Sequence, residues 1–341
     1  MTEPADPASP RALGDQWAAR VRGALGAAEG SAFLTRLSLA ADDMREALST
    51  VYGGVADIDA LLERAVRMSL ATAAERPAEL RLLDRRREID PDWFLRPRMQ
   101  GYVCYLDRFC GSLAALPERI DYLAELGTTY LHLMPLLRPR PGENDGGYAV
   151  MDYRSVDPRV GTMAELQDVA TALRQRGMSL CIDLVVNHTA REHAWAQGWL
   201  AGDPAYLDFY TAFPDRTTPD AYDSRIPDVF PDRAPGSFTW VPEARGGTGG
   251  WVWTTFWPYQ WDLNYANPEV LLAMLGEILW LANQGIEIFR MDAVPFLWKR
   301  LGTNGQNQPE AHAIMQAFHG LVRWPPQRRS SRPRRSCPRR S

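Results

Sequence analysis

From residue 101 onward the chain alternates between short apolar runs and longer amphipathic stretches, and this alternation restricts the fold strongly. The short runs resemble strands, whereas the longer stretches place apolar residues at helical spacing. Glycine follows two helical stretches, at Gly127 and Gly177, as is common after a helix C-terminus. Strands that alternate with helices form a parallel sheet through right-handed crossovers, so we expect an α/β fold. The predicted strands are 102–106, 130–134, 179–186 and 286–291, and the predicted helices are 113–126, 163–176, 268–283 and 310–322.

Four strand-helix units make the first half of a (β/α)8 barrel of the TIM type. The preceding segment has apolar residues at helical spacing, which predicts an all-helical N-terminal domain. About eighty residues rich in Pro, Gly, Asp and Trp separate the third strand from its helix and predict a small inserted domain. Half a barrel has two open sheet edges, which disfavours stable folding. The predicted divisions are 1–97 (helical domain), 98–190 (first three barrel units), 191–259 (insert), 260–323 (third helix to fourth unit) and 324–341 (basic tail).

Composition restricts the class of protein. The formal net charge is −4, but residues 324–341 carry seven Arg and no acidic residue, which leaves −11 for residues 1–323. An acidic folded part argues against binding to nucleic acid.

Cys104, Cys110 and Cys181 lie in apolar runs without a CxxC pair, as reduced core residues do. The N-terminus lacks a signal-like segment and no run reaches the length of a membrane span, so we expect a cytoplasmic protein without membrane association.

Polar residues end the third predicted strand. Asp183 lies within an apolar run, and Asn187 and His188 follow at its C-terminal end, where parallel α/β folds keep their active sites. His188 is placed to donate a hydrogen bond to a substrate hydroxyl, and Asp183 to orient His188 or a neighbouring loop. A buried structural Asp and a capping Asn are the alternative, which would be favoured if these residues stood alone.

The fourth predicted strand carries Arg290 and Asp292 two positions apart, so both side chains point to the same face. An adjacent Arg lowers the pKa of a carboxylate and keeps it ionised, as a nucleophile that attacks an anomeric carbon requires. A structural ion pair inside the barrel explains this motif equally well.

Two further motifs favour sugar contacts. Asp145-Gly-Gly-Tyr148 lies in a Pro/Gly-rich loop after the second strand, and its glycines permit a tight turn that presents Asp145 and Tyr148. Five Trp crowd into residues 240–261 beside Phe256 and Gln260, which we predict to contact the ligand. Aromatic rings stack on sugar faces, although a plain turn and a packed irregular insert are the alternatives.

Taken together and in this order, these runs resemble the α-amylase superfamily of glycoside hydrolases. Asp183-x-x-x-Asn-His188 is similar to its first signature region, and Gly285-x-x-x-x-Arg-x-Asp292 to its second. Within the superfamily, the stretches 144–150, 201–216, 251–265 and 290–294 and the helical N-terminal domain resemble amylosucrase. The resemblance covers nearly all of the chain up to Arg323.

The resemblance implies a retaining transglucosidase that takes sucrose and passes its glucosyl unit to an α-1,4-glucan acceptor. Asp292 would be the nucleophile and Arg290 its partner. The glucosyl pocket would be lined by Asp145, Tyr148, His188, Phe256 and Gln260, with Asp183 and Asn187 orienting the site. No metal or organic cofactor is implied. A sucrose hydrolase or α-glucosidase on the same scaffold, and a sugar-binding fragment without catalysis, remain alternatives. The oligomeric state stays open.

The segment 324–341 is the one part that does not fit the resemblance. It reads as a disordered basic arm or as a shifted reading frame after Arg323, because GC-rich codons for 331–338 read in another frame encode a strand-like Lys-Ala-Glu-Ala-Ile-Val. The family's acid/base glutamate and second half of the barrel lie beyond the residues matched here. Since a missing general acid costs roughly 10²–10⁴-fold, we expect this chain to be inactive toward sucrose.

Overall fold

The computed structural model describes residues 10–90 and 92–322, so the basic tail predicted over 324–341 lies outside the described residues. The N-terminal part consists of helices α1 (Pro10–Tyr52), α2 (Ile58–Glu75) and α3 (Ala78–Ile89), as expected from the helical spacing of its apolar residues. Gly26 interrupts α1 with a positive φ of 77°, a conformation that glycine adopts without a steric penalty. Asp57 caps α2 by accepting hydrogen bonds from the backbone of Asp59 and Ala60.

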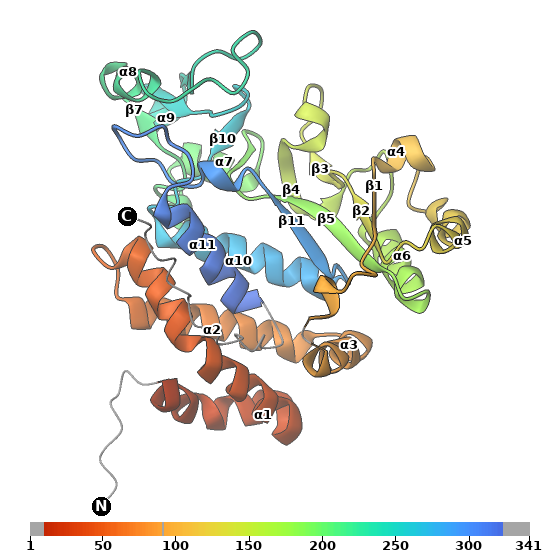
Figure 1. Ribbon diagram of the computed structural model, residues 1–341. Coiled ribbons are helices and arrows are strands. Elements are labelled where there is room, and N and C mark those ends of the chain that lie inside the picture. Colours follow the sequence, from red (N-terminus) through yellow and green to blue (C-terminus); the bar gives the residue numbers. More distant parts are fainter. Residues whose placement is uncertain (1–9, 91, 323–341) are drawn as a thin grey trace, which may run out of the picture.

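The central sheet confirms the predicted α/β fold. Four parallel strands lie in the order β1 (Gly101–Cys104), β2 (Tyr130–Leu133), β5 (Ser179–Val185) and β11 (Ile288–Asp292). This order follows the chain, so each unit adds the next strand of a partial barrel (Figure 1). β5, which is paired on both sides, is buried along its whole length.

The helices that connect these strands agree closely with the sequence pattern, with one exception. α6 (Met163–Gln175), α10 (Pro268–Asn283) and α11 (Pro309–Val322) occupy the expected ranges. The helix predicted over 113–126 is wrong in extent, because this stretch forms a 3-10 turn, η2 (Leu116–Arg119), followed by the short helix α5 (Ile120–Glu125). Pro117 lacks a backbone N–H, so a regular helix cannot run through this position from Leu113.

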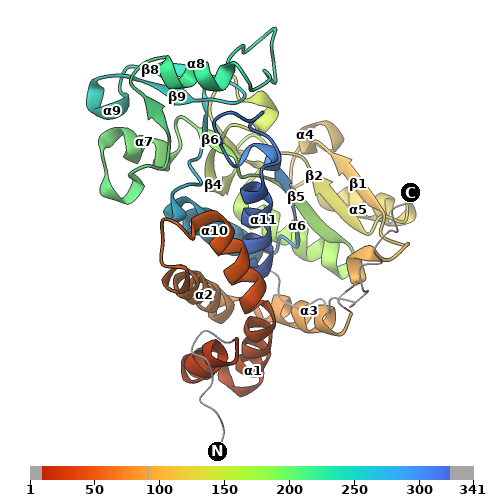
Figure 2. The ribbon, with the colours of Figure 1, turned by 60° about the vertical axis from the view of Figure 1, so that its left-hand side comes forward.

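Helices α1 and α2 pack against α10 and α11, which lie between them and the sheet (Figures 1 and 2). Polar contacts fix α2 on α10. Arg64 forms two hydrogen bonds of 2.6 and 2.7 Å with Glu269, and the Asn283 amide donates to the Thr72 carbonyl at 2.9 Å. The helical domain therefore supports the outer side of the partial barrel.

Two regions interrupt the strand-helix pattern. After β2, an antiparallel hairpin forms from β3 (Leu137–Pro139) and β4 (Val150–Val156), which the pattern did not predict. After β5, the short strand β6 (His188–Ala190) pairs antiparallel with β10 (Gln260–Asp262), and between them lies a sheet of order β7-β9-β8. The remaining elements are β7 (Ala212–Phe213), β8 (Phe238–Val241), β9 (Gly250–Trp253), α4 (Leu106–Phe109), α7 (Ala194–Ala201), α8 (Thr217–Asp223), α9 (Ala244–Gly247), η1 (Trp93–Leu95), η3 (Asp145–Gly147), η4 (Pro204–Tyr206) and η5 (Val294–Phe296).

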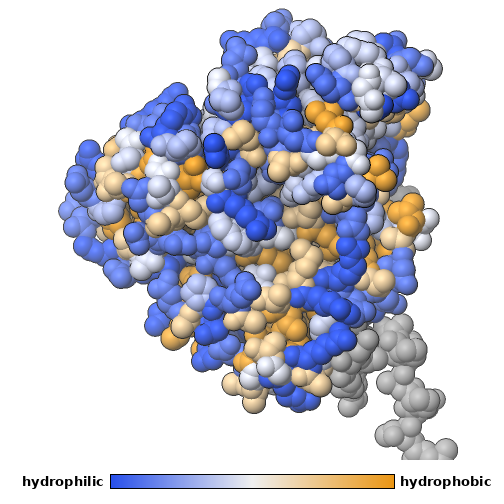
Figure 3. All heavy atoms as spheres, turned by 180° about the vertical axis from the view of Figure 1, so that it is seen from behind, coloured by the Kyte–Doolittle hydropathy of each residue, from blue (hydrophilic) through white to orange (hydrophobic). Residues whose placement is uncertain are grey.

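The surface is mainly hydrophilic. On the face shown in Figure 3, apolar side chains lie in small groups between polar ones. None of the helices in the described part of the chain is long and apolar enough to cross a membrane.

Candidate active site

The predicted nucleophile and its partner lie at the C-terminal end of the sheet. β11 pairs with β5 in a register that places Arg290 opposite Asp183. One terminal nitrogen of Arg290, Nη1, donates to Asp183 Oδ1 at 2.9 Å and to Asp292 Oδ1 at 2.6 Å. Arg290 thus links two carboxylates on neighbouring strands, and it fixes the position of Asp292 relative to β5.

Asp183 is buried and connects to a second strand and a loop. The Tyr148 hydroxyl donates to Asp183 Oδ2 at 3.2 Å, which brings the Asp-Gly-Gly-Tyr loop to the same end of the sheet. His132 Nε2 on β2 lies 3.4 Å from Asp183 Oδ1. Burial raises the pKa of Tyr148, so its hydroxyl stays protonated and able to donate. His132 is not among the predicted site residues, although a histidine between two leucines in a predicted strand was a usable signal.

The direction of the pKa shift at Asp292 differs from the expectation. The pKa of Asp292 is raised, because burial of the carboxyl outweighs the lowering by Arg290 and His188. The expected lowering by an adjacent Arg is therefore present but is the smaller effect. Arg290 offsets part of the cost of burying a carboxylate at this position.

Asp145 and Gln260 form a second polar group in the site. Asp145 has a positive φ of 54°, and Gly147, with a φ of 102°, packs where a Cβ would lie 2.8 Å from Pro135. This tight turn directs the Asp145 carboxylate toward Gln260, whose Nε2 donates to Asp145 Oδ2 at 3.3 Å. Burial raises the pKa of Asp145, and the hydrogen bond from Gln260 lowers it.

His188 is buried against an aromatic ring. Its centroid lies 5.1 Å from that of Phe256, and its Nε2 lies 3.2 Å from the Tyr148 carbonyl oxygen. Burial lowers the pKa of His188, so the neutral form is favoured. His188 was predicted to donate to a substrate hydroxyl, and in this structure its Nε2 faces a backbone carbonyl while its Nδ1 lies 3.4 Å from Asn187 Nδ2. His188 therefore joins the Tyr148 loop to the Phe256 wall.

Asn187, next to His188, belongs to a buried polar cluster whose other members, Asp262 and Lys299, were not predicted. Its Nδ2 donates to Asp262 Oδ2 at 2.9 Å, and Lys299 Nζ donates to its Oδ1 at 2.9 Å. Asp262 and Lys299 come from β10 and the loop after β11. A lysine directly after the apolar run 293–298, which follows Asp292, was the signal available in the sequence.

All nine residues predicted for the site therefore gather at the C-terminal end of the sheet. They come from β5, β6, β10 and β11, from the turn between β5 and β6, from the connection between β3 and β4, and from the loop after β9. Their side chains offer a carboxylate held by an arginine, a second carboxylate with an amide, and aromatic rings, an arrangement suited to a polar ring-shaped ligand. Within residues 10–90 and 92–322 no group of three His, Cys, Asp or Glu side chains is arranged to hold a metal ion.

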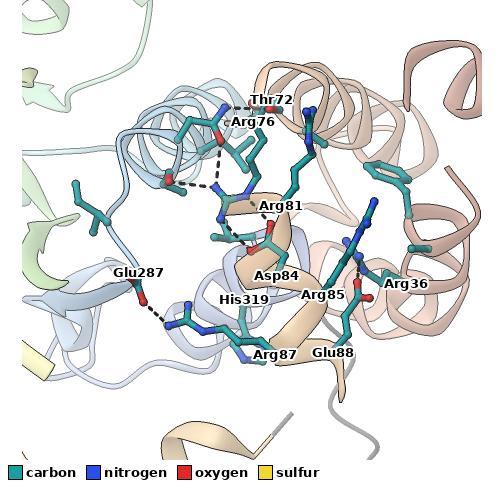
Figure 4. A pocket seen from close by; sticks show the side chains of 18 of the residues that line it. Arg36, Thr72, Arg76, Arg81, Asp84, Arg85, Arg87, Glu88, Glu287 and His319 are labelled. Atoms are coloured by element: carbon teal, nitrogen blue, oxygen red, sulfur yellow. Dashed lines mark hydrogen bonds and ion pairs between the residues drawn. The ribbon is translucent and has the colours of Figure 1, made fainter. Parts of the chain in front are cut away.

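A cavity of about 700 Å³ lies elsewhere, between the N-terminal helices, α10, α11 and β11 (Figure 4). Charged side chains in its wall are paired with each other: Arg76 contacts Asp84 at 2.6 Å, and Arg87 contacts Glu287. Arg87 also lies 3.8 Å from the centroid of the Trp93 ring. These contacts join the helical domain to the sheet, and none of the predicted site residues lines this cavity.

Comparison with known proteins assigns this sequence to a family. The sequence profile described as "Alpha amylase, catalytic domain" matches residues 84–326. The chain belongs to this family. The lineage is therefore that of glycoside hydrolases and glycosyltransferases of the alpha-amylase type, as the signature-like motifs indicate. The matched profile describes the family as a whole and does not single out amylosucrase.

Relatives carry several different names. The chain is 37% identical to a trehalose synthase of Pimelobacter sp. over 62% of its own length and 35% of the relative. It is 36% identical to a glucosylglycerate phosphorylase of Spirochaeta thermophila, over 64% of the chain and 35% of the relative. It is 33% identical to an oligo-1,6-glucosidase of Halalkalibacterium halodurans, over 62% and 39%. The chain thus spans little more than a third of the length of these relatives.

Solved structures agree on the fold. An enzyme described as family GH13_31 superposes with a TM-score of 0.55 at 26% identity, covering 66% of this chain and 44% of the other. The trehalulose synthase MutB from Pseudomonas mesoacidophila MX-45 gives a TM-score of 0.57 at 24% identity, covering 66% and 42%. At this level of identity the latter shows the fold alone.

Proposed function

We propose that this chain carries the glucosyl-binding half of a retaining α-transglucosidase, with Asp292 as the nucleophile. The observation that carries the proposal is the Arg290 bridge, which holds Asp292 at the C-terminal end of β11 and ties it to buried Asp183. Family membership supports the reaction class. The roles of the individual residues are part of the proposal.

The proposed chemistry follows from the two-carboxylate mechanism of retaining glycosidases. An oxygen of Asp292 attacks the anomeric carbon of an α-glucoside, the bond to the leaving-group oxygen breaks, that oxygen takes a proton from water, and a β-glucosyl ester forms. An acceptor hydroxyl or water then attacks the same carbon, gives its proton to the solvent and releases the Asp292 carboxylate. Arg290 stabilises the ionised nucleophile, Tyr148 and Phe256 offer apolar faces to the sugar ring, and Asp145 with Gln260 accepts and donates hydrogen bonds to hydroxyls.

For the donor and acceptor we propose sucrose and an α-glucan, on the resemblance of the motifs to amylosucrase. The names of the relatives refer to trehalose, glucosylglycerate and 1,6-linked oligosaccharides, so they support a glucosyl donor without fixing which one. A hydrolase on the same scaffold would transfer the glucosyl unit to water. We expect the protein to act in the cytoplasm, without a nucleic-acid partner.

The nucleophile can be tested with an α-glucosyl fluoride that carries a second fluorine on the sugar ring. Fluoride departs without protonation, so the first step needs no general acid, and the ring fluorine slows release of the glucosyl group. We expect intact-mass spectrometry to show one fluoroglucosyl adduct on the 341-residue chain, located by peptide mapping at Asp292.

Two variants control this experiment. Asp292→Asn removes the nucleophile and is expected to abolish the adduct. Asp121→Asn alters an exposed aspartate on α5, far along the chain from the site, and is expected to label like the unmodified chain. An adduct that persists in Asp292→Asn, or no adduct at all, would contradict the proposed role.

The donor can be ranked by protection. Sucrose, trehalose and isomaltose are added at equal concentrations, and the slowing of fluoroglucosyl labelling is measured for each. We expect sucrose to protect most strongly, and stronger protection by another disaccharide would redirect the substrate assignment. Saturable glucose binding by calorimetry without any labelling would favour the sugar-binding alternative.

A further inference from the structure

A lysine outside the proposed glucosyl pocket makes three polar contacts. Lys299 lies in the loop after β11, and its side chain is 17% exposed. Its Nζ lies 2.8 Å from Asp262 Oδ2 and donates to Asn187 Oδ1 and to the backbone carbonyl of Phe296. An ammonium has three N–H donors, so these contacts use all of them. The same nitrogen lies 5.7 Å from the centroid of the Trp253 ring.

The partner carboxylate is equally well satisfied. Asp262 Oδ1 accepts from the Thr255 backbone N–H at 2.9 Å, and its Oδ2 accepts from the Thr255 hydroxyl at 2.6 Å and from Asn187 Nδ2 at 2.9 Å. Its side chain is 1% exposed. Because buried ions are tolerated only when their partners are in place, the pair specifies one arrangement of the segments that meet there.

These segments adjoin two residues predicted for the pocket and the loop that follows Asp292. Asn187 precedes His188, and Thr255 precedes Phe256. Phe296, whose carbonyl accepts from Lys299, packs its ring on Phe256 with centroids 5.1 Å apart. His188 also packs against Phe256, with ring centroids 5.1 Å apart. Lys299 therefore connects the loop that follows Asp292 to His188 and Phe256, two residues predicted to line the glucosyl pocket.

We propose that Lys299 is a positioning residue for glucosyl transfer, which holds His188, Phe256 and the loop after the nucleophile in register. This inference rests on the proposed function, because the pocket it aligns is the one that presents a glucosyl unit to Asp292. Lys299 itself does not touch the reacting atoms. A displacement of about 1 Å in such a support costs about 100-fold in rate.

The test compares labelling rates by the fluorinated glucosyl fluoride in four proteins: the unmodified chain, Lys299→Met, the double variant Lys299→Met/Asp262→Asn, and Arg76→Met. Arg76 is a matched control because its side chain is also 17% exposed and it pairs with a largely buried carboxylate, Asp84, far from the site. Each rate is measured against reagent concentration, so that the maximal rate separates from binding, and each melting temperature is recorded.

We expect the maximal labelling rate to fall about 100-fold in Lys299→Met and to stay low in the double variant, whose lost charges are balanced. Arg76→Met is expected to lose stability but to keep the maximal rate of its folded fraction. If the double variant regains the rate of the unmodified chain, Lys299 serves only to neutralise Asp262 and the proposal is wrong. An unchanged rate in Lys299→Met overturns it as well.

A second readout separates this inference from the proposed function. The ring of His188 is followed by NMR with histidine labelled at Cε1, assigned with His188→Gln. Since His188 lies against Phe256, the nuclear Overhauser effect from its Cε1 proton to the Phe256 ring reports the spacing of the two rings, independently of the charges that the substitutions remove. We expect this effect to weaken in the double variant and to stay unchanged in Arg76→Met. If the unmodified chain shows no adduct, the proposed function fails, and an unchanged effect between the two rings in the double variant then overturns the positioning role independently.

Discussion

At the scale of single residues, the site depends on how burial and charge balance at Asp292. Burial raises the pKa of this carboxyl, whereas Arg290, at 2.6 Å, lowers it. Arg290 also neutralises Asp183, whose side chain is buried. Its own side chain is 50% exposed, which weakens the interaction by solvent screening. The Arg290 guanidinium thus favours the ionised form of Asp292 and offsets the cost of burying Asp183.

Replacing Arg290 with methionine is expected to raise the pKa of Asp292 further, because the main lowering influence is lost. Asp292 attacks only when ionised, so the acidic limb of the labelling rate against pH moves to higher pH. Arg290→Lys keeps the positive charge and is expected to move the limb less. The check is the pH profile of fluoroglucosyl labelling for the three proteins. An identical midpoint in all of them would show that Arg290 does not control the charge of the nucleophile.

At the scale of elements, the sequence predicted those helices and strands whose ends are set by neighbouring residues. The range 268–283 became α10 without change, because Asn267 caps it and Pro268 fits the first helical position. The pair Lys299 and Asp262 could not be predicted, because its members are 37 residues apart in different elements and no periodicity links them. The same holds for the β3–β4 hairpin, whose first strand ends in Pro139 and resembles a loop.

Helix α7 offers a prediction at this scale. His193 caps it, since its Nδ1 accepts from the Trp195 backbone N–H at 3.1 Å, and burial lowers its pKa to about 4. A histidine in an unfolded chain titrates near 6.5, so the unfolded state binds a proton first as the pH falls. The stabilising contribution is complete above that pH and decreases toward pH 4, by about 2 kcal/mol between pH ~7 and ~5.

His193→Asn keeps an acceptor at the cap and removes the titration. We expect the unmodified chain to lose about 2 kcal/mol more than this variant between pH ~7 and ~5, measured by urea unfolding at both values. All other titratable groups are the same in both proteins, so their contributions cancel in the comparison. Equal losses would mean that His193 is protonated in the folded state at pH ~5.

At the scale of the whole molecule, the sheet has unequal strands. Within residues 10–90 and 92–322, β2 and β5 are paired on both sides, whereas β1 and β11 are paired on one. Helices α1 and α2 pack on α10 and α11, and neither adds a hydrogen-bonded neighbour to β1 or β11 (Figure 2). The strand that carries Asp292 is therefore an outer strand of the described sheet, and its rigidity rests on β5 and on the Arg290 bridge.

This inequality predicts the pattern of amide hydrogen exchange. Backbone amides of β5 are expected to exchange slowest, because opening them requires separation from two neighbours, and those of β1 and β11 are expected to exchange faster. Mass spectrometry of peptides covering 179–185 and 288–292 makes the comparison directly. Arg290→Met should accelerate exchange in the second peptide more than in the first, since it removes the side-chain bridge between the strands. Protection of β11 equal to that of β5 would contradict the open edge, and would mean that another strand, from outside the described residues or from a second copy, pairs with it in solution.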